Sequence, residues 1–362
     1  MNGDGRPRFA MYWCAACGGC DIAVLNLHAQ LLDVADRFEI AFWPAVVDTK
    51  YADLEAMPDR SITLTLFSGA IRTSENEELA RLLRRKSQIL VAFGACASLG
   101  GIPGLANLHG PDEIFATMYE EGISTVNPDG VRPQPRVDVL EGELQLPVFQ
   151  PLVRSLGQVV PIDYIVPGCP PETARIAEIM VAVGDALDGR AALPPTGSVL
   201  GAGSSTVCDE CARERHEKRL ARFVRLQSTP RLDPALCLLE QGIPCNGSAT
   251  RSGCGALCPA AGAQCIGCYG PAVGVFDQGS RLLSAFASIV DAREALDIER
   301  ALDAIADPVG QFYRFGLATS PLRGGRHGMS ATAGAGSETR QEPREIDPDR
   351  GLVATVASGE RA

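Results

Sequence analysis

Residues 88–96, Gln-Ile-Leu-Val-Ala-Phe-Gly-Ala-Cys, decide the fold of this chain. They join an apolar run, typical of a buried strand, to a glycine and a cysteine directly behind it. The same order appears at Phe9–Trp13, which leads to Cys-Gly-Gly-Cys at 17–20. It appears again at Ile162–Val166, which leads to Pro-Gly-Cys at 167–169. Three predicted strands are therefore each followed by cysteine.

Helical patterns alternate with these strands. Apolar side chains recur at helical spacing in 75–85 and 172–187, and Asp21 is suited to the start of a helix that runs to about Ala35. Further strands are predicted at 38–43 and 61–67. The alternation predicts an α/β fold, a doubly wound parallel sheet with helices on both faces. Cysteines behind different strands should then meet at one edge of the sheet, where ligands bind in such folds.

Twelve of the thirteen cysteines fall into sets of four. Four lie behind the predicted strands: Cys17, Cys20, Cys96 and Cys169. Eight crowd into one later stretch: Cys208, Cys211, Cys237, Cys245, Cys254, Cys258, Cys265 and Cys268. Thiolate favours iron–sulfur clusters, zinc and Cu(I), and a [4Fe–4S] cluster takes four thiolates. Three such clusters would form a path for electrons, whereas structural zinc sites in an interaction protein are the alternative.

Length, composition and net charge limit the kinds of protein that this chain can be. A length of 362 residues predicts about two domains, and a hydrophobic content of 46% is enough for a core. No apolar run reaches the roughly 18 residues of a membrane span, and the short polar N-terminus shows no export signal, so we expect a cytoplasmic protein. That setting disfavours disulfides, and a net charge of −11 argues against nucleic acid as a partner.

The composition divides the chain into three parts. Residues 1–195 carry the alternating pattern, with a long surface excursion at 120–160. Residues 196–322 are rich in Gly and Cys and lack strand patterns, with a helical stretch at 279–304. Metal clusters are expected to serve as the core of residues 208–268. Residues 323–362 contain few large apolar residues and are predicted to be disordered.

Other candidates have simpler interpretations. Cys14 forms a CxxC pair with Cys17, but we interpret it as a small buried hydrophobe. His216 and the surrounding basic run are typical of a solvated helix face, although this run would also suit an acidic electron-transfer partner. The basic residues are Arg213, Arg215, Lys218, Arg219, Arg222 and Arg225.

Several motifs resemble those of [NiFe] hydrogenase small subunits. They are Trp13–Asp21, Gly69–Ile71, Gly94–Cys96, Gly100–Gly104 and Val166–Pro171, followed by the block Cys237–Gly270. The resemblance covers roughly residues 9–320. Its closest branch is the cytoplasmic, methyl-viologen-reducing type that pairs with heterodisulfide reductase.

The resemblance implies a flavodoxin-like domain and a small irregular iron–sulfur domain. The four strand-end cysteines match the ligands of a proximal [4Fe–4S] cluster. Cys254, Cys258, Cys265 and Cys268 match a medial cluster, and Cys208, Cys211, Cys237 and Cys245 match a distal one. Membrane-bound and periplasmic relatives have His at the position of Cys208 and commonly Pro near Cys258, so both residues favour the cytoplasmic branch. Ser68 stands where relatives often have an acidic residue, which weakens any proton path here.

The resemblance also implies that this chain carries electrons and that a large subunit carries out catalysis. Electrons from H2 oxidation would pass from a large subunit with the NiFe centre to an acceptor such as heterodisulfide reductase or a small iron–sulfur protein. This chain lacks the second set of paired cysteines that a NiFe centre needs, so we assign it no catalytic residue. An iron–sulfur subunit of a quinone- or formate-linked complex is the alternative, but such relatives usually hold only the proximal cluster.

Overall fold

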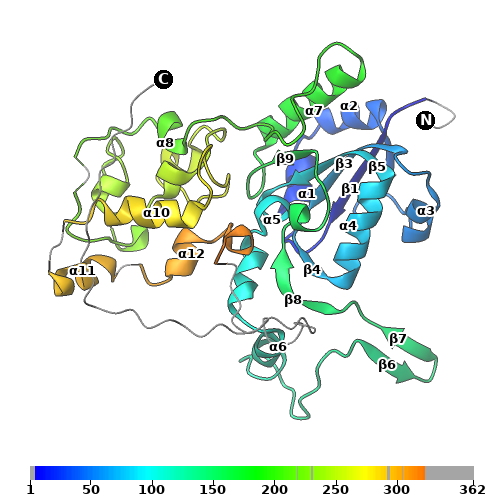
Figure 1. Ribbon diagram of the computed structural model, residues 1–362, viewed down its shortest axis with the longest axis horizontal. Helices are drawn as coiled ribbons and strands as arrows, with labels where there is room; N and C mark the ends of the chain where they lie inside the picture. The colour runs from blue at the N-terminus through cyan, green and yellow to red at the C-terminus, as the bar shows by residue number, and fades with distance from the viewer. Residues whose placement is uncertain (1–4, 218, 230, 292–293, 304, 323–362) are drawn as a thin grey trace, which may run out of the picture. The chain divides into compact units, whose positions relative to one another are not determined.

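A parallel sheet organises the N-terminal half of the computed structural model (Figure 1). Its order is β2-β1-β3-β5-β9, and every neighbouring pair is parallel. The strands are β1 (Arg8–Trp13), β2 (Glu39–Phe42), β3 (Ile62–Ser68), β5 (Ser87–Phe93) and β9 (Tyr164–Val166). Counted along the sheet, this is the flavodoxin-like order 2-1-3-4-5. The predicted α/β fold is confirmed.

The structure describes residues 5–217, 219–229, 231–291, 294–303 and 305–322. All of them lie within one unit, Met1–Gly328, while the second unit, Met329–Ala362, lies outside the described residues. The predicted disordered tail, 323–362, therefore remains a prediction. The division between 1–195 and 196–322 also remains a prediction.

The strand register brings the carboxyl ends of four strands to the same level. Trp13 pairs with Ser68, and Ser68 pairs with Phe93. Phe93 in turn pairs with Val166. The loops that carry the strand-end cysteines therefore leave the sheet side by side.

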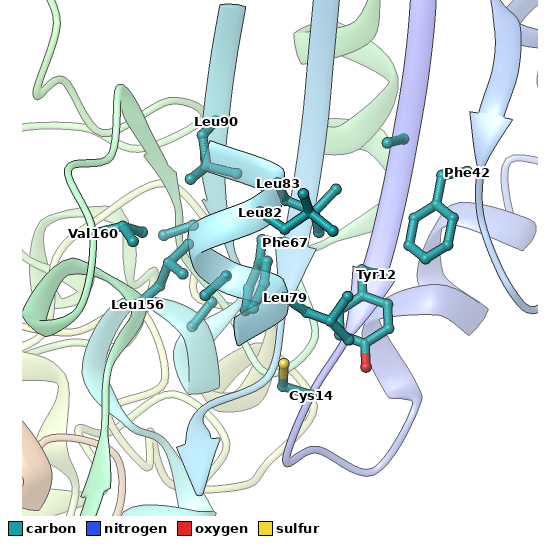
Figure 2. Close-up of a cluster of buried hydrophobic side chains, with 14 of the residues drawn as sticks. Tyr12, Cys14, Phe42, Phe67, Leu79, Leu82, Leu83, Leu90, Leu156 and Val160 are labelled. Atoms are coloured by element: carbon teal, nitrogen blue, oxygen red, sulfur yellow. The ribbon is translucent and has the colours of Figure 1, made fainter. Parts of the chain in front are cut away.

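Apolar side chains of the sheet pack on both of its faces. Ala10 and Tyr12 of β1 belong to a core cluster that includes Leu79 and Leu83, as Figure 2 illustrates. Phe9 and Met11 belong to a second cluster, which includes Val24 and Ile176. Successive residues of a strand point to opposite faces, so this division confirms the doubly wound arrangement.

Helices follow the strands, with one departure from prediction. The helices of the N-terminal half are α1 (Gly19–Leu25), α2 (Gln30–Arg37), α3 (Tyr51–Ala56), α4 (Ser74–Lys86), α5 (Ala95–Leu99), α6 (Pro111–Tyr119) and α7 (Thr173–Leu187). The single helix expected over 21–35 is wrong. Residues 26–29 form a turn in which His28 has φ 53°, and this left-handed residue separates α1 from α2.

The excursion at 120–160 contains regular structure of its own. β6 (Arg136–Val139) and β7 (Gly142–Gln145) form an antiparallel hairpin whose residues are all exposed. β8 (Phe149–Arg154) pairs antiparallel with the short β4 (Ile71–Thr73). The sequence did not predict these pairings, because each depends on a partner strand distant in sequence or on short polar runs.

The cysteine-rich half consists of short helices and irregular loops. Its α-helices are α8 (Val207–Glu210), α9 (Leu257–Ala260), α10 (Gln278–Ala287), α11 (Ala295–Leu302) and α12 (Pro308–Phe312). The 3₁₀ helices of the chain are η1 (Ile102–Leu108), η2 (Leu156–Gln158), η3 (Leu226–Ser228), η4 (Leu239–Gln241), η5 (Asn246–Ala249) and η6 (Leu317–Thr319). Within the described ranges, no helix longer than a few residues and no strand lies between α7 and α10.

Two expectations for this half need correction. The helix expected for the basic run is absent from the described part of 213–225, where Glu214 and Leu220 instead form isolated bridges with Leu236 and Val290. Metal clusters are also not its whole core, because Phe223 stacks on Phe286 at 5.1 Å inside an apolar cluster. None of the helices described has the length and apolar character that crossing a membrane requires.

Candidate metal centres

Backbone hydrogen bonds join the loops behind β5 and β9. The Gly94 N–H donates to the Val166 carbonyl, and the Ala95 N–H donates to the Gly168 carbonyl, each at 2.7 Å. These bonds hold Cys96, at the start of α5, near Cys169. The strand register alone would make the two loops neighbours without fixing their positions relative to each other.

Two glycines form a cradle for the sulfurs of this set. A Cβ atom built on Gly94 would lie 2.5 Å from Cys20 Sγ, and one built on Gly101 would lie 2.6 Å from Cys96 Sγ. Both glycines have positive φ, 85° and 57°. Side chains at these positions would displace the sulfurs, so the sulfurs can occupy these places only because glycine is present.

The four strand-end thiols influence one another electrostatically. Burial is the main cause that raises the pKa of Cys20 and that of Cys96, the latter to about 12 in all. The thiols of Cys17 and Cys169 contribute to both shifts, which places all four groups in one neighbourhood. Cys17 and Cys169 are exposed and Cys96 is buried, so the set reaches from the interior to the surface.

A buried carboxylate lies directly beside this set. Asp21, in the first turn of α1 as predicted, accepts a hydrogen bond from Trp43 Nε1 at 2.9 Å. The Ser68 hydroxyl donates to its other oxygen at 3.5 Å. Burial raises the pKa of Asp21, and these hydrogen bonds oppose that shift.

In the set of Cys254, Cys258, Cys265 and Cys268, backbone amides point at sulfur. The N–H groups of Ala256 and Leu257 lower the pKa of Cys254 against the larger raising effect of burial. The Gly267 N–H acts in the same way on Cys265. Amide donors of this kind stabilise anionic sulfur and set cluster potentials.

The last four cysteines line a single cavity, together with two arginines. Cys208, Cys211, Cys237 and Cys245 share its wall with Arg213 and Arg215. Arg213 is held rigidly, because it donates to the carbonyls of Asp233, Leu236 and Pro259 at 3.0 Å each. The sequence missed this role for the arginines, because their spacing favoured a solvated helix.

His216 is not among the residues that line this cavity, and its ring lies 3.5 Å from the Glu214 carboxylate. Its backbone N–H donates to Glu240. Lys218, the third residue of the basic run, lies outside the described residues.

The three sets lie next to one another. The pKa of Cys268 is raised to about 12, chiefly by burial, and the backbone N–H of Cys169 opposes that shift. The backbone N–H of Cys265 donates to Cys245 Sγ at 3.3 Å. The first set therefore contacts the second, and the second contacts the third.

Cys14 lies in the apolar core. It is buried in the cluster of Tyr12 and Leu79, where Figure 2 places its sulfur below the leucine. Its N–H donates to the Ser68 carbonyl at 2.9 Å, and burial raises its pKa. Its packing as a small hydrophobe is confirmed.

The arrangement of donors fits iron–sulfur clusters. All thirteen cysteines lie in the described part of the chain, and no disulfide joins any two of them. Among the described residues, no group of three or more His, Cys, Asp or Glu side chains converges tightly enough to hold a metal ion. Thiolates around a [4Fe–4S] cluster bind different irons and do not need to converge on one point.

This chain is similar to a family of oxidoreductase subunits and to subunits of several known hydrogenases. A family model described as NADH ubiquinone oxidoreductase, 20 Kd subunit, matches residues 17–183. An iron–sulfur subunit of the F420-non-reducing hydrogenase of Archaeoglobus profundus is 46% identical over 281 residues, which cover 76% of this chain and 85% of that protein. A subunit of the F420-non-reducing hydrogenase of Methanothermobacter marburgensis is 36% identical over 316 residues, 86% of this chain and 94% of that protein. A solved chain of an NAD+-reducing [NiFe]-hydrogenase shares 28% identity over 52% of this chain and 96% of its own length, with a TM-score of 0.43.

Proposed function

Because this chain belongs to the family of [NiFe] hydrogenase small subunits, in the methyl-viologen-reducing branch, we propose that it conducts electrons through three [4Fe–4S] clusters in series. The chain is a subunit of an oxidoreductase complex that acts on H2, and its partner is a large subunit. Our proposal concerns the number of clusters, their ligands, their order and the acceptor.

We assign one set of four cysteines to each cluster. Cys17, Cys20, Cys96 and Cys169 would hold the proximal cluster. Cys254, Cys258, Cys265 and Cys268 would hold the medial cluster, and Cys208, Cys211, Cys237 and Cys245 the distal one. The shared cavity of the last four supports their assignment to one cluster. The mutual effects of the strand-end thiols on their pKa values support theirs.

The protein residues determine how well each centre exchanges electrons. An iron–sulfur cluster, when bound, accepts and releases single electrons. The amides at Cys254 and Cys265 stabilise negative charge on the sulfurs. Arg213 and Arg215 place positive charge beside the distal set. Apolar packing around Val207, Ala256 and Cys265 keeps water away from the inner sulfurs.

The contacts between sets carry the proposal. The Cys169 N–H reaches the sulfur of Cys268, and the Cys265 N–H reaches the sulfur of Cys245. Each pair joins a residue of one proposed cluster to a ligand of the next. Electrons would therefore pass between neighbouring ligand shells in the order proximal, medial, distal.

The acceptor and the setting are the finer parts of the proposal. The resemblance to the branch that pairs with heterodisulfide reductase favours that enzyme, or a small iron–sulfur protein in front of it, as the acceptor in the cytoplasm. Nickel would remain in the large subunit, and this chain alone would not split H2.

Metal analysis and spectroscopy test the clusters. Besides the iron of the NiFe centre and of any other subunit, the complex isolated anaerobically should contain about 12 iron atoms and as many sulfides for each copy of this chain, three clusters of four. Zinc without sulfide would contradict the proposal and favour a structural role.

Variants test the order of the clusters. In Cys245→Ala, H2 should still reduce the proximal and medial clusters, seen by electron paramagnetic resonance, while the acceptor stays oxidised. In Cys96→Ala, H2 should reduce none of the clusters in this chain. Reduction of the medial cluster in Cys96→Ala would contradict a series arrangement.

A further inference from the structure

Three buried polar side chains lie next to the loop that carries Cys265 and Cys268. Asn246 begins η5, Thr250 follows the last residue of η5, and Gln278 begins α10. They are 2%, 1% and 8% exposed. Buried polar groups in folded proteins are hydrogen-bonded, so the partners of these three show which groups they hold in place.

The side-chain amide of Gln278 holds the carbonyls at the far end of this loop. Its Nε2 lies 3.2 Å from the carbonyl oxygens of Gly267 and Gly270, and 3.0 Å from the Thr250 hydroxyl. The two hydrogens of this amide therefore have three acceptors within reach, and both are used. Gly267 has φ 96°, and a Cβ built on it would lie 3.2 Å from Gln278 Nε2, so glycine permits this close approach.

Asn246 holds the carbonyls at the near end of the loop. Its backbone N–H donates to the Cys265 carbonyl at 2.9 Å, and its side-chain amide donates to the Ile266 carbonyl at 3.4 Å. The Ile266 carbonyl and the Gly267 N–H belong to one trans peptide and point in opposite directions. Because Asn246 contacts the carbonyl side of this peptide, the Gly267 N–H is turned to the opposite side.

Two groups held in this way favour negative charge on the Cys265 sulfur. Burial raises the pKa of Cys265, and the Gly267 N–H and the Thr250 hydroxyl oppose that shift. The hydroxyl itself is fixed, because it donates to the Asn246 carbonyl at 2.6 Å and accepts from Gln278. The orientation of both groups therefore depends on buried amides outside the loop.

Donors beside a cluster sulfur stabilise the reduced cluster, because reduction adds negative charge to it. We propose that Gln278 is a positioning residue for the medial centre: it fixes the loop of Cys265 and Cys268 so that donors face the sulfurs, which raises the reduction potential of the medial cluster. This inference rests on the proposed function, in which these two cysteines bind that cluster. A raised potential favours the passage of electrons from the proximal cluster to the medial one.

Redox titration of the anaerobically isolated complex, followed by electron paramagnetic resonance, tests the proposal. The medial signal is identified as the one that Cys265→Ala removes. Gln278→Met keeps an unbranched side chain but has no N–H donor. At the potential that reduces half of the wild-type medial cluster, this variant should lower the ratio of reduced to oxidised cluster about ten-fold, equal to about 59 mV for one electron.

Thr250 offers a matched pair of variants. Thr250→Val keeps the branched shape but removes the hydroxyl that accepts from Gln278, whereas Thr250→Ser keeps that hydroxyl. Thr250→Val should lower the same ratio about three-fold, as expected for the loss of one hydrogen bond, and Thr250→Ser should leave it unchanged.

Leu282→Ala is the control for lost packing in α10. Leu282 is fully buried in the apolar cluster of Phe286, so this variant should lower the melting temperature without changing the medial ratio. An unchanged ratio in Gln278→Met would overturn the proposal, and so would an equal fall in Leu282→Ala. If Gln278→Met loses the medial iron, the Thr250 pair decides, because equal ratios in Thr250→Val and Thr250→Ser would also overturn it.

The same measurements separate this proposal from the proposed function. If Cys265→Ala removes none of the cluster signals, the assignment of Cys265 to a cluster fails, and the proposed function fails with it. If Cys265→Ala removes one signal and Gln278→Met leaves the potential of that signal unchanged, only the role of Gln278 is refuted.

Discussion

Gly94→Ala should remove the proximal cluster while leaving the fold in place. Gly94 has φ 85° and ψ 166°, a region that residues with a Cβ rarely occupy. Forcing alanine into it costs about 1–3 kcal/mol. That cost alone would lower stability without specifically affecting a cluster.

The specific effect comes from the position of the new methyl group. The Cβ would lie 2.5 Å from Cys20 Sγ, whereas ordinary contacts begin at 3.4 Å. The sulfur would therefore have to move by about 1 Å, several times the roughly 0.2 Å tolerance of a metal–ligand bond. Cys20 should lose its bond to iron, and the cluster iron of this chain should fall from about 12 to about 8 atoms, not counting the iron of the NiFe centre.

Iron analysis and resonance of the isolated complex measure this loss. Gly189→Ala is the matched control, because Gly189 also has positive φ, 72°, but no atom lies within 4 Å of the added Cβ. It should lower the melting temperature, through about 1–2 kcal/mol of backbone strain, without loss of iron. Full iron content and an unchanged proximal signal in Gly94→Ala would refute the placement of Cys20 at the cluster.

Three further predictions concern the other cysteines and the metal. Cys14→Ala should keep all iron and cost about 1 kcal/mol of stability, whereas Cys17→Ala should lose the proximal cluster and H2-dependent dye reduction; the reverse result would make Cys14 the ligand. Cys258→Pro should leave a [3Fe–4S] centre, visible as a new signal in the oxidised protein, and three unchanged [4Fe–4S] signals would show that Cys258 is not a ligand. Chelation of iron should increase hydrogen exchange in 196–322 while β3 and β5 stay protected. If both regions lost protection equally, a metal-dependent core in 196–322 would be contradicted.

The sequence predicted the sheet because its signals are local. The apolar run at 88–93 and the glycine after it were enough to predict a strand with a cysteine behind it. The structure places β5 at Ser87–Phe93. The meeting of the strand-end cysteines follows from parallel topology, since carboxyl ends share one edge. The break at His28 was not predicted, because a single left-handed residue leaves the helical spacing of apolar residues intact.

The arrangement of the other eight cysteines could not be predicted from spacing. In this half, the short helices and loops show no regular spacing of apolar residues from which their contacts could be predicted. Their partition into two sets came from the resemblance, and it remains a proposal. The cavity shared by Cys208 and Cys245 depends on contacts between residues 37 positions apart. Arg213 is held in its wall by hydrogen bonds to three carbonyls that are distant in sequence.

The Cys-Pro-Pro sequence at 169–171 places Cys169 next to two of the cysteine sets. Pro170 and Pro171 lack an N–H, so Cys169 supplies the only backbone donor of the three. Its side chain lies with the proximal set, while its N–H reaches the sulfur of Cys268 in the medial set. The loop behind β9 therefore ties the position of one set to that of the next. A change in this loop should disturb the proximal and medial signals together, whereas the distal set, held by Cys265 and Arg213, should respond less.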